Sequence, residues 1–473
     1  MSKLKPTMQK NRLAAALTAT FLLAGCTLGP DYVRPTSTLP EQTLETNSDA
    51  RTQAPINPEW WTLFNDASLN NLVGQALAAN QDLQAAIARL EAAEASAREA
   101  GSEFYPAIGA SANGSRNRSS GETVSGKNTG AQTYNSRRAA LSLSYEVDLW
   151  GRIRRSNEAA RAEALASQFG RDSIRLTLIG QVANEYLALR SLDAQLQVTE
   201  QTLESRRQSL KIVQARLDAG SASALELAQA ESVLSGAQAQ LNQLKRQRAL
   251  SENQLGLLTG QPGLKLAADT LERLPLPPTP PAGLPSSLLE ARPDIRQAEE
   301  KLVAANARIG VAKAAYFPTI GLTGLYGGES MALSGLFSSS ATIWSAALGL
   351  SMPIFDAGRT GARVDQASAL QKENLATYRK TVQSAFREVN DALASLREYA
   401  EEEAAFKAQV AASQRALNLA QMRYEAGYSG YFDLLDSQRT LNSAQLLYLA
   451  TRKNRLAAAV DLFKALGGGW QAG

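Results

Sequence analysis

The chain contains 473 residues, 44% of them hydrophobic and 20% charged, a composition typical of a folded protein larger than one ordinary domain. It has no histidine and a single cysteine, which excludes histidine-based zinc sites, histidine-dependent catalytic triads and a disulfide within the chain. The formal net charge is +4, but the basic excess lies in Lys3, Lys5, Lys10 and Arg12. The rest of the chain is therefore nearly neutral, which argues against a nucleic-acid-binding protein.

Residues 1–25 predict a secretory signal peptide, because a basic start precedes an apolar stretch too short to span a membrane. Ala24 and Gly25 directly precede Cys26, the single cysteine. This pattern resembles a bacterial lipobox, which implies cleavage before Cys26 and covalent lipid on it; we expect no other bound group. Two or three acyl chains would anchor the protein stably. Lipoproteins retained in the inner membrane typically carry aspartate directly after the lipidated cysteine, so Thr27 at this position favours the outer membrane. The alternative is an ordinary signal peptide with an incidental cysteine.

Residues 26–65 predict an extended, lipid-anchored arm, because they are rich in proline, threonine and asparagine. We expect Trp60 and Trp61 to pack this arm on the body of the protein. A helical pattern then follows over about 67–103.

Four segments in which apolar residues alternate with small or polar residues predict β-strands. These segments lie at about 104–116, 138–150, 317–327 and 342–355. In each of them one face is apolar, whereas the other carries serine, glycine, threonine and other small residues. The glycine-, serine- and asparagine-rich residues 115–135 predict an exposed hairpin loop between the first two strands.

Apolar residues at heptad spacing predict two pairs of long helices, at 152–218 and 222–260, and at 358–425 and 431–466. Gly220 and Gly427 follow the first helix of each pair and predict sharp turns, so each pair forms an antiparallel hairpin. A proline-rich connector joins two copies of one order: helix, strand, strand, long helix, turn, helix. The copies are 66–260 and 286–466, the connector is 261–285, and the tail is 467–473.

This pattern predicts a mainly α-helical protein with a transmembrane β-barrel that has a wet lumen. Four strands cannot close a barrel, and an open edge is not viable in lipid, so several chains must share the barrel. Two chains would give eight strands with almost no lumen, whereas three would give twelve and could enclose a channel. A soluble sheet packed on the helices is the alternative, but the helices are very long for so small a sheet.

Several short motifs lie along nearly the whole chain. After the lipobox they are GPDYVRP at 29–35, YEVDLWGR at 145–152, RPDI at 292–295, PIFDAGR at 353–359 and ALGGGW at 465–470. Together they resemble TolC-like outer-membrane efflux proteins, in particular the lipid-anchored NodT/OprM type. The resemblance implies a homotrimer with a twelve-stranded barrel in the outer membrane, continued by an α-helical barrel across the periplasm. It implies a passive gated duct for drugs or other small compounds, not an enzyme. The implied partners are a periplasmic adaptor and an inner-membrane pump of the RND type.

The resemblance also places a periplasmic gate at the helical turns. Asp433 and Asp436 match acidic positions that would ring the narrowest point in the trimer, attract cations and repel one another. Glu226 matches an acidic gate partner, and Tyr424 matches a gate-latching tyrosine. The alternative for each acid is a solvated side chain or a favourable charge at a helix N-terminus.

Some relatives carry a gate arginine where this chain has Ser429. The contact by which that arginine helps to hold the gate closed is therefore expected to be absent here. We therefore expect Tyr424, Tyr428, Tyr431 and Leu435 to hold the closed state.

Three other functions fit part of the pattern. Paired carboxylates can hydrolyse glycans, but Asp433 and Asp436 lie beside a helical turn without a substrate cleft. A structural lipoprotein that tethers the envelope through its coiled coils would need no barrel, so the alternating strands argue against it. An outlet for a secreted polypeptide remains in the export class, although the predicted lipid anchor favours drug efflux.

Overall fold

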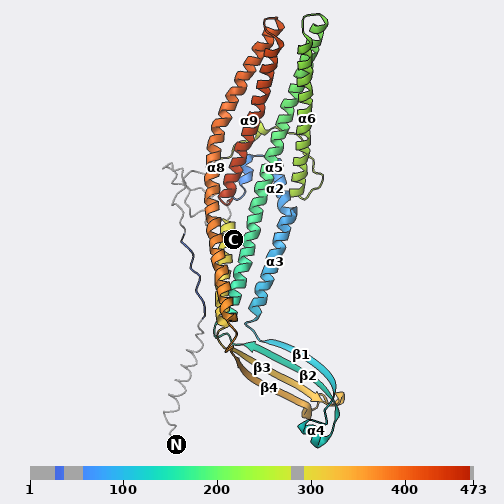
Figure 1. The fold of residues 1–473 in the computed structure, drawn as a ribbon, viewed down its shortest axis with the longest axis vertical. Helices are drawn as coiled ribbons and strands as arrows, with labels where there is room; N and C mark the ends of the chain where they lie inside the picture. Colours follow the sequence, from blue (N-terminus) through green and yellow to red (C-terminus); the bar gives the residue numbers. More distant parts are fainter. Residues whose placement is uncertain (1–26, 37–56, 279–291, 469–473) are drawn as a thin grey trace. The chain divides into compact units, whose positions relative to one another are not determined.

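The computed structural model describes residues 27–36, 57–278 and 292–468, and it is drawn in Figure 1. The predicted mainly helical chain with a small four-stranded sheet is confirmed within these residues. They divide into two compact units. The predicted signal peptide, Cys26 and the end of the tail lie outside the described residues. None of the described helices is long and apolar enough to cross a membrane.

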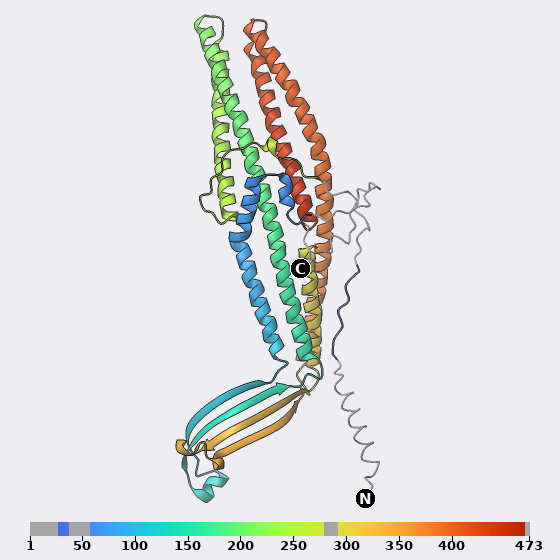
Figure 2. The same cartoon turned by 180° about the vertical axis from the view of Figure 1, so that it is seen from behind.

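The first unit contains an antiparallel sheet in the order β1-β2-β3-β4. Its strands are β1 (Ala107–Arg118), β2 (Thr133–Glu146), β3 (Thr319–Ser330) and β4 (Thr342–Ser351), and they curve together in Figures 1 and 2. A short helix, α4 (Val124–Thr129), lies in the connection between β1 and β2. Because consecutive strands are neighbours, β1 and β4 are the two edges of the sheet, and neither edge pairs with another described strand.

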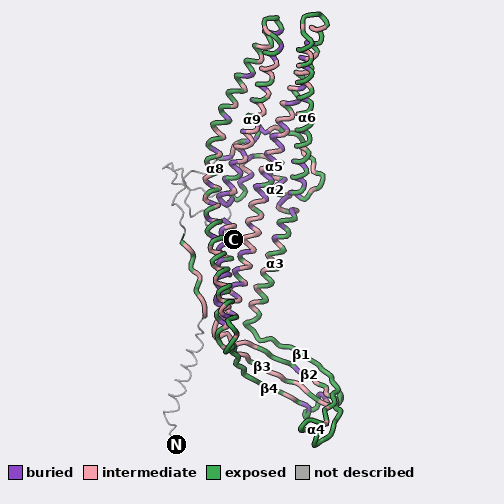
Figure 3. The backbone as a smooth tube through the Cα atoms, in the orientation of Figure 1, coloured by how far each residue is buried: buried purple, intermediate pink, exposed green. Residues whose placement is uncertain are grey.

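The two faces of the sheet differ in polarity. Residues paired across the strands share a face, and successive residues alternate between faces. One face therefore carries a row of exposed apolar side chains: Ile108, Leu141, Leu143, Tyr326, Trp344, Leu348 and Leu350. The central rows of the other face carry Ser111, Ser142, Ser144, Thr323 and Ser345. Figure 3 shows the strands coloured mainly as exposed.

The strands end earlier than predicted at their junctions with the long helices. β2 ends at Glu146 rather than at 150, because the Asp148 carboxylate accepts the N–H groups of Ile153 (3.1 Å) and Arg154 (2.9 Å). These two bonds cap the following helix and require a sharp turn in place of further strand. β4 likewise ends at Ser351 rather than at 355, because the Asp356 carboxylate accepts the N–H of Thr360 at 2.9 Å.

At their hairpin ends β1, β2 and β3 are longer than predicted, whereas β4 begins at Thr342 as predicted. β1 continues to Arg118 and β2 begins at Thr133, so the connecting loop is shorter than 115–135. At its helix end, by contrast, β1 is shorter than predicted and begins at Ala107 rather than at 104, because Phe104 and Tyr105 donate backbone hydrogen bonds to the end of the preceding helix.

Residues 27–36 of the first unit are tied to helix α7 (Pro293–Ala314) and to the start of α5 (Arg152–Asp218). A Cβ on Gly29 would lie 2.6 Å from the Cα of Gly310, so only glycine permits this approach. Arg34 forms an ion pair with Glu299, and Arg155 with Asp31 at 2.6 Å. The GPDYVRP motif therefore docks this segment.

The second unit contains most of two helical hairpins, whose helices α5 and α8 begin in the first unit. α5 pairs with α6 (Ala224–Leu258), and α8 (Arg359–Glu425) pairs with α9 (Tyr431–Ala465). Its core includes Trp60, whose ring stacks on Phe463 with centroids 5.4 Å apart.

Two predictions about the N-terminal part of this unit are wrong. The extended arm does not reach residue 65, because Trp60–Phe64 forms a 3-10 helix that buries both tryptophans. The helix expected over 67–103 is two helices, α2 (Ala67–Ala79) and α3 (Gln81–Ser102). Asn80 separates them: its side chain accepts the N–H of Leu83 and donates to the carbonyl of Leu258, each at 3.0 Å.

Candidate gate at the helical turns

Both hairpins of the second unit turn at a glycine with positive φ, +72° at Gly220 and +78° at Gly427. Such a glycine reverses the chain without a Cβ clash, and the next N–H then satisfies a carbonyl near the helix end. The bonds are Ser221 N–H to the Arg216 carbonyl and Tyr428 N–H to the Arg423 carbonyl, each 2.8 Å. The turns therefore repeat the same geometry.

The helices that follow the turns begin differently. Ser223 and Glu226 form a capping box at the start of α6: Glu226 N–H donates to the Ser223 hydroxyl and Ser223 N–H to the Glu226 carboxylate. Such a box satisfies two exposed helix donors. At the start of α9 the corresponding residue is Gly430, which provides no side-chain cap. The α8–α9 turn thus lacks a stabilising contact that the α5–α6 turn has.

A buried apolar cluster joins the two hairpins close to their turns. It consists of Val213, Ala230, Tyr424, Tyr431 and Leu434, with Leu435 packed at its edge. The two tyrosine rings lie with centroids 5.7 Å apart. Because the cluster takes residues from α5, α6, α8 and α9, separating the hairpins would expose it to water.

Arg216 links the end of α5 to the end of α8. Its guanidinium lies 4.3 Å from the centre of the Tyr424 ring and donates to the carbonyls of Tyr424 (3.2 Å) and Glu425 (3.4 Å). A cation at this position satisfies orphan carbonyls and complements the negative end of the helix dipole. Arg216 is not among the residues predicted from the sequence. Its position as a basic residue in the last turn of α5 was a sequence signal that could have identified it.

Further along the hairpins, α5 contacts α6 and α9 through polar side chains. Arg206 donates to the carbonyl of Val233 at 2.6 Å, and burial lowers the pKa of this arginine. Gln438 donates to the hydroxyl of Ser209 at 3.2 Å. These bonds fix the register of α5 against its neighbours.

The predicted gate acids occupy three different environments. Asp433 is exposed on the first turn of α9. Asp436 lies one turn later and forms an ion pair with Arg439 at 2.8 Å. Glu226 is engaged in the capping box. Within one chain these carboxylates form no common cluster, so any ring depends on other copies of the chain.

The residues expected to hold the closed state are only partly brought together. Tyr424, Tyr431 and Leu435 belong to the buried cluster. Tyr428 is 80% exposed and lies outside that cluster, so its predicted role in holding the closed state would require a contact with another copy of the chain and stays a prediction. The hydroxyl of Ser429 is buried without a hydrogen-bond partner among the described residues. Among the described residues, the Ser429 side chain therefore forms no hydrogen bond in place of the gate arginine that is expected in some relatives.

Comparison with known proteins identifies the class of protein that carries these paired turns. A sequence model of the outer membrane efflux protein family matches residues 72–261 and 284–468. The chain belongs to this family, and it is therefore an outer-membrane protein of the efflux-channel class. The predicted resemblance to TolC-like efflux proteins is confirmed.

Particular relatives match over nearly their whole length. The antibiotic efflux pump outer membrane protein ArpC of Pseudomonas putida is 36% identical, over 98% of this chain and 96% of ArpC. The solvent efflux pump outer membrane protein SrpC of Pseudomonas putida is 38% identical, over 96% of this chain and 97% of SrpC. The solved open state of the MtrE outer membrane channel of Neisseria gonorrhoeae is 33% identical, with a TM-score of 0.83 over 94% of this chain and 98% of that one.

Proposed function

We propose that the chain is the exit duct of a tripartite efflux system, acting as a homotrimer. Three sheets close one twelve-stranded barrel in the outer membrane, and the helical hairpins of three copies form an α-helical barrel in the periplasm. The duct is passive and has no catalytic chemistry. Lipid on Cys26 anchors each copy in the same membrane.

The sheet carries this proposal. It has an exposed apolar face, a face of small polar residues, and two edges that pair with no described strand. Unpaired backbone groups are very costly in hydrocarbon, so β1 of one copy must pair with β4 of another. Closure then turns the apolar face towards lipid and the serine-rich face towards a water-filled lumen.

We infer the cargo and partners by analogy with the family. ArpC and SrpC are named for antibiotics and solvents respectively, so we infer that this duct also carries small, largely apolar compounds. A periplasmic adaptor docks on the helical hairpins, and an inner-membrane pump of the RND type supplies the energy. The pump selects the cargo, because the duct needs no binding site of its own.

The first test measures the mass and the single-channel conductance of the purified protein in a planar bilayer. We expect a trimer whose channel is closed most of the time and passes small, cation-selective currents when it opens. A monomer that never conducts would overturn both the shared barrel and the duct.

We further propose that the turns are the gate and that the α8–α9 hairpin is its moving part. The missing cap at Gly430 supports this choice, because it leaves that turn less stable than the α5–α6 turn. In the trimer the exposed Asp433 side chains ring the pore, whereas Arg439 partly neutralises Asp436.

The variants Asp433→Asn and Asp436→Asn test the ring, with reversal potentials in a salt gradient as the measurement. We expect Asp433→Asn to reduce cation selectivity more strongly, because this carboxylate has no paired cation in the described structure. Equal selectivity of wild type and Asp433→Asn trimers would remove Asp433 from the gate.

A further inference from the structure

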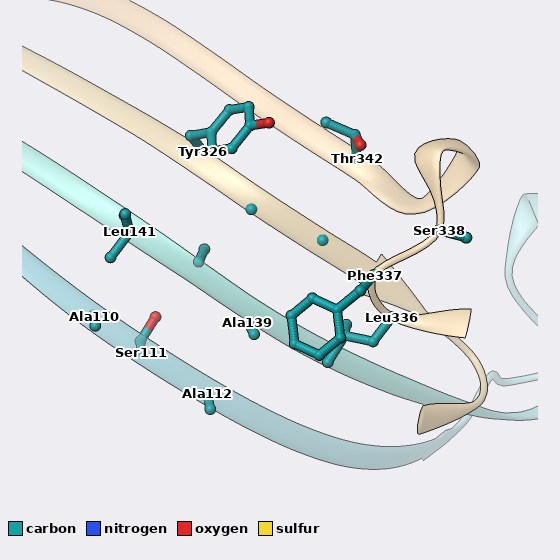
Figure 4. Close-up of a pocket in the computed structure, with 13 residues that line it drawn as sticks. Ala110, Ser111, Ala112, Ala139, Leu141, Tyr326, Leu336, Phe337, Ser338 and Thr342 are labelled. Atoms are coloured by element: carbon teal, nitrogen blue, oxygen red, sulfur yellow. The ribbon is translucent and has the colours of Figure 1, made fainter. Parts of the chain in front are cut away.

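A hollow lies on the apolar face of the sheet, beside the connection between β3 and β4. Leu336 of this connection is buried against the sheet, where a Cβ on Gly328 would collide with the Leu336 carbonyl. The next residue, Phe337, is 88% exposed. Figure 4 shows both side chains reaching towards β2 near Ala139. The hollow has a volume of about 580 Å³ and is lined mainly by alanine, leucine and aromatic side chains.

Three arginines lie on the same face of the sheet, between the hollow and the hairpin end of β1 and β2. The row Ala112–Ala139 lines the hollow, and the next rows towards the hairpin end on this face are Gly114–Arg137, Arg116–Asn135 and Arg118–Thr133. A Cβ on Gly114 would lie 2.5 Å from Nη1 of Arg137, so the guanidinium lies across β1 where glycine leaves space. Arg116 is the next residue of β1 on this face.

The positive charge of Arg116, Arg118 and Arg137 is not balanced within the described residues. None of the three has a side-chain hydrogen bond or ion pair there. Glu329 in the neighbouring strand lies on the opposite face and accepts a hydrogen bond from Ser136 at 2.9 Å. All three arginine side chains are exposed, so their guanidinium groups can form charge-assisted hydrogen bonds with an anion from outside the chain.

The hairpin ends of the strands locate this cluster in the membrane, and here the inference rests on the proposed function. The opposite ends of all four strands lead into the helices. If those helices cross the periplasm, the hairpin ends and their arginines lie at the level of the outer leaflet. This surface is complementary to an anionic lipid, because the apolar part can contact an acyl chain and the unpaired guanidinium groups can contact a negatively charged headgroup.

We propose that this surface binds a phosphorylated lipid of the outer leaflet. One acyl chain occupies the hollow, and a headgroup phosphate accepts hydrogen bonds from the guanidinium groups of Arg137 and Arg116. Arginine suits this role because its planar fork matches phosphate oxygens and remains charged. Arg118 adds positive potential one row further out.

The test is a titration of the full-length detergent-solubilised protein with bisphosphorylated lipid A, followed by native mass spectrometry. Phosphatidylcholine and inorganic phosphate are titrated in parallel. We expect Arg116→Gln with Arg137→Gln to weaken lipid A binding by about tenfold or more, as the loss of charge-assisted hydrogen bonds requires. The control is Arg138→Gln, because Arg138 neighbours Arg137 but lies on the opposite face, and we expect it to leave the affinity almost unchanged.

A second variant, Ala112→Phe, tests the hollow without changing charge. We expect it to weaken lipid A binding while leaving the salt dependence of binding intact. Inorganic phosphate should bind far more weakly than lipid A, because it cannot fill the hollow.

The proposal would be overturned if the variant with both Arg116→Gln and Arg137→Gln bound lipid A as tightly as wild type. An equal loss in Arg138→Gln, which would indicate unspecific attraction, or phosphate binding as tight as that of lipid A would also overturn it. Conductance of the same samples separates the two proposals. A conducting trimer without lipid A selectivity refutes only the lipid site, whereas a monomer without conductance refutes the duct.

Discussion

At the scale of single residues, Arg216 couples the two hairpins most directly. It combines a cation–π contact with hydrogen bonds to the last carbonyls of α8. Interactions of these kinds together contribute about 2 kcal/mol when partly shielded from water. Their loss should therefore ease separation of the hairpins without unfolding either of them.

We expect Arg216→Gln to accelerate amide hydrogen exchange in the α8–α9 turn by about tenfold or more, and to raise the open probability of the channel. The matched control is Arg423→Gln, since Arg423 occupies the same place in the other hairpin but its side chain is exposed. An equal effect of both substitutions would show that Arg216 has no special role.

Glu252 gives a second prediction at this scale, concerning acid stability. Its buried carboxylate accepts hydrogen bonds from Arg248 (2.8 Å), Lys265 (2.9 Å) and the N–H of Leu266 (3.0 Å). Burial opposes ionisation, but these bonds prevail and lower the pKa of Glu252 below its usual value of 4.5. Its contribution to stability is therefore present above pH 4.5 and is lost as the pH falls through the lowered pKa.

Thermal unfolding between pH 3 and pH 7 checks this prediction. The Glu252→Gln variant should be less stable than wild type at pH 7, by roughly 1–3 kcal/mol. The difference should shrink as the pH falls below 4.5. A constant difference over the whole range would contradict the assigned sign.

The sequence predicted the types of residue at the turns but not all their partners. Gly427 and Tyr424 stood out because they interrupt or close a helical period. Arg216 did not, because its role depends on α8, which lies far away in the sequence and adjacent only in the fold. Asn80 was missed for the same reason: its side chain separates two helices partly through the carbonyl of Leu258.

At the scale of elements, the α8–α9 turn should depend on one backbone conformation. Gly427 has φ +78°, and a Cβ there would meet no atom within 4 Å. Any cost of Gly427→Ala is therefore conformational, about 1–2 kcal/mol for a left-handed residue. Gly430 has φ −74° and similar open space, so Gly430→Ala is a matched control without this strain.

We expect Gly427→Ala to raise hydrogen exchange around the turn, whereas Gly430→Ala should leave it unchanged or slow it slightly. The prediction fails if alanine is tolerated equally at both positions.

The ends of elements were harder to predict than their type. Apolar periods distinguish helix from strand because side chains repeat every 3.6 or 2 residues. The ends of β2 and β4 instead depend on Asp148 and Asp356, whose carboxylates cap the next helix. The alternation of apolar residues continues past these caps and therefore gave strands that were too long.

At the scale of the whole molecule, the polarity of the two sheet faces should decide insertion into the outer membrane. Leu348 lies on the apolar face and Ala347 on the opposite face of the same strand. An arginine near the middle of the lipid-facing surface of a barrel costs about 2–4 kcal/mol, whereas a lumen position tolerates charge.

We therefore expect Leu348→Arg to reduce the yield of assembled trimer in outer-membrane fractions, measured by gel mobility before and after heating. The Ala347→Arg variant should assemble normally and change only conductance. If Ala347→Arg is the more damaging substitution, the faces of the proposed barrel are reversed.

The unpaired edges β1 and β4 also have a genetic consequence. In the proposed trimer, a defective copy would inactivate every assembly that contains it, because the barrel closes only if each strand edge finds a partner. With equal synthesis of normal and defective copies and random mixing, only about one trimer in eight would be wholly normal. In cells that carry both alleles, a mutation should be dominant if the altered copy still joins a trimer but its strand edge cannot close the barrel. A mutation that prevents the copy from joining any trimer should be recessive.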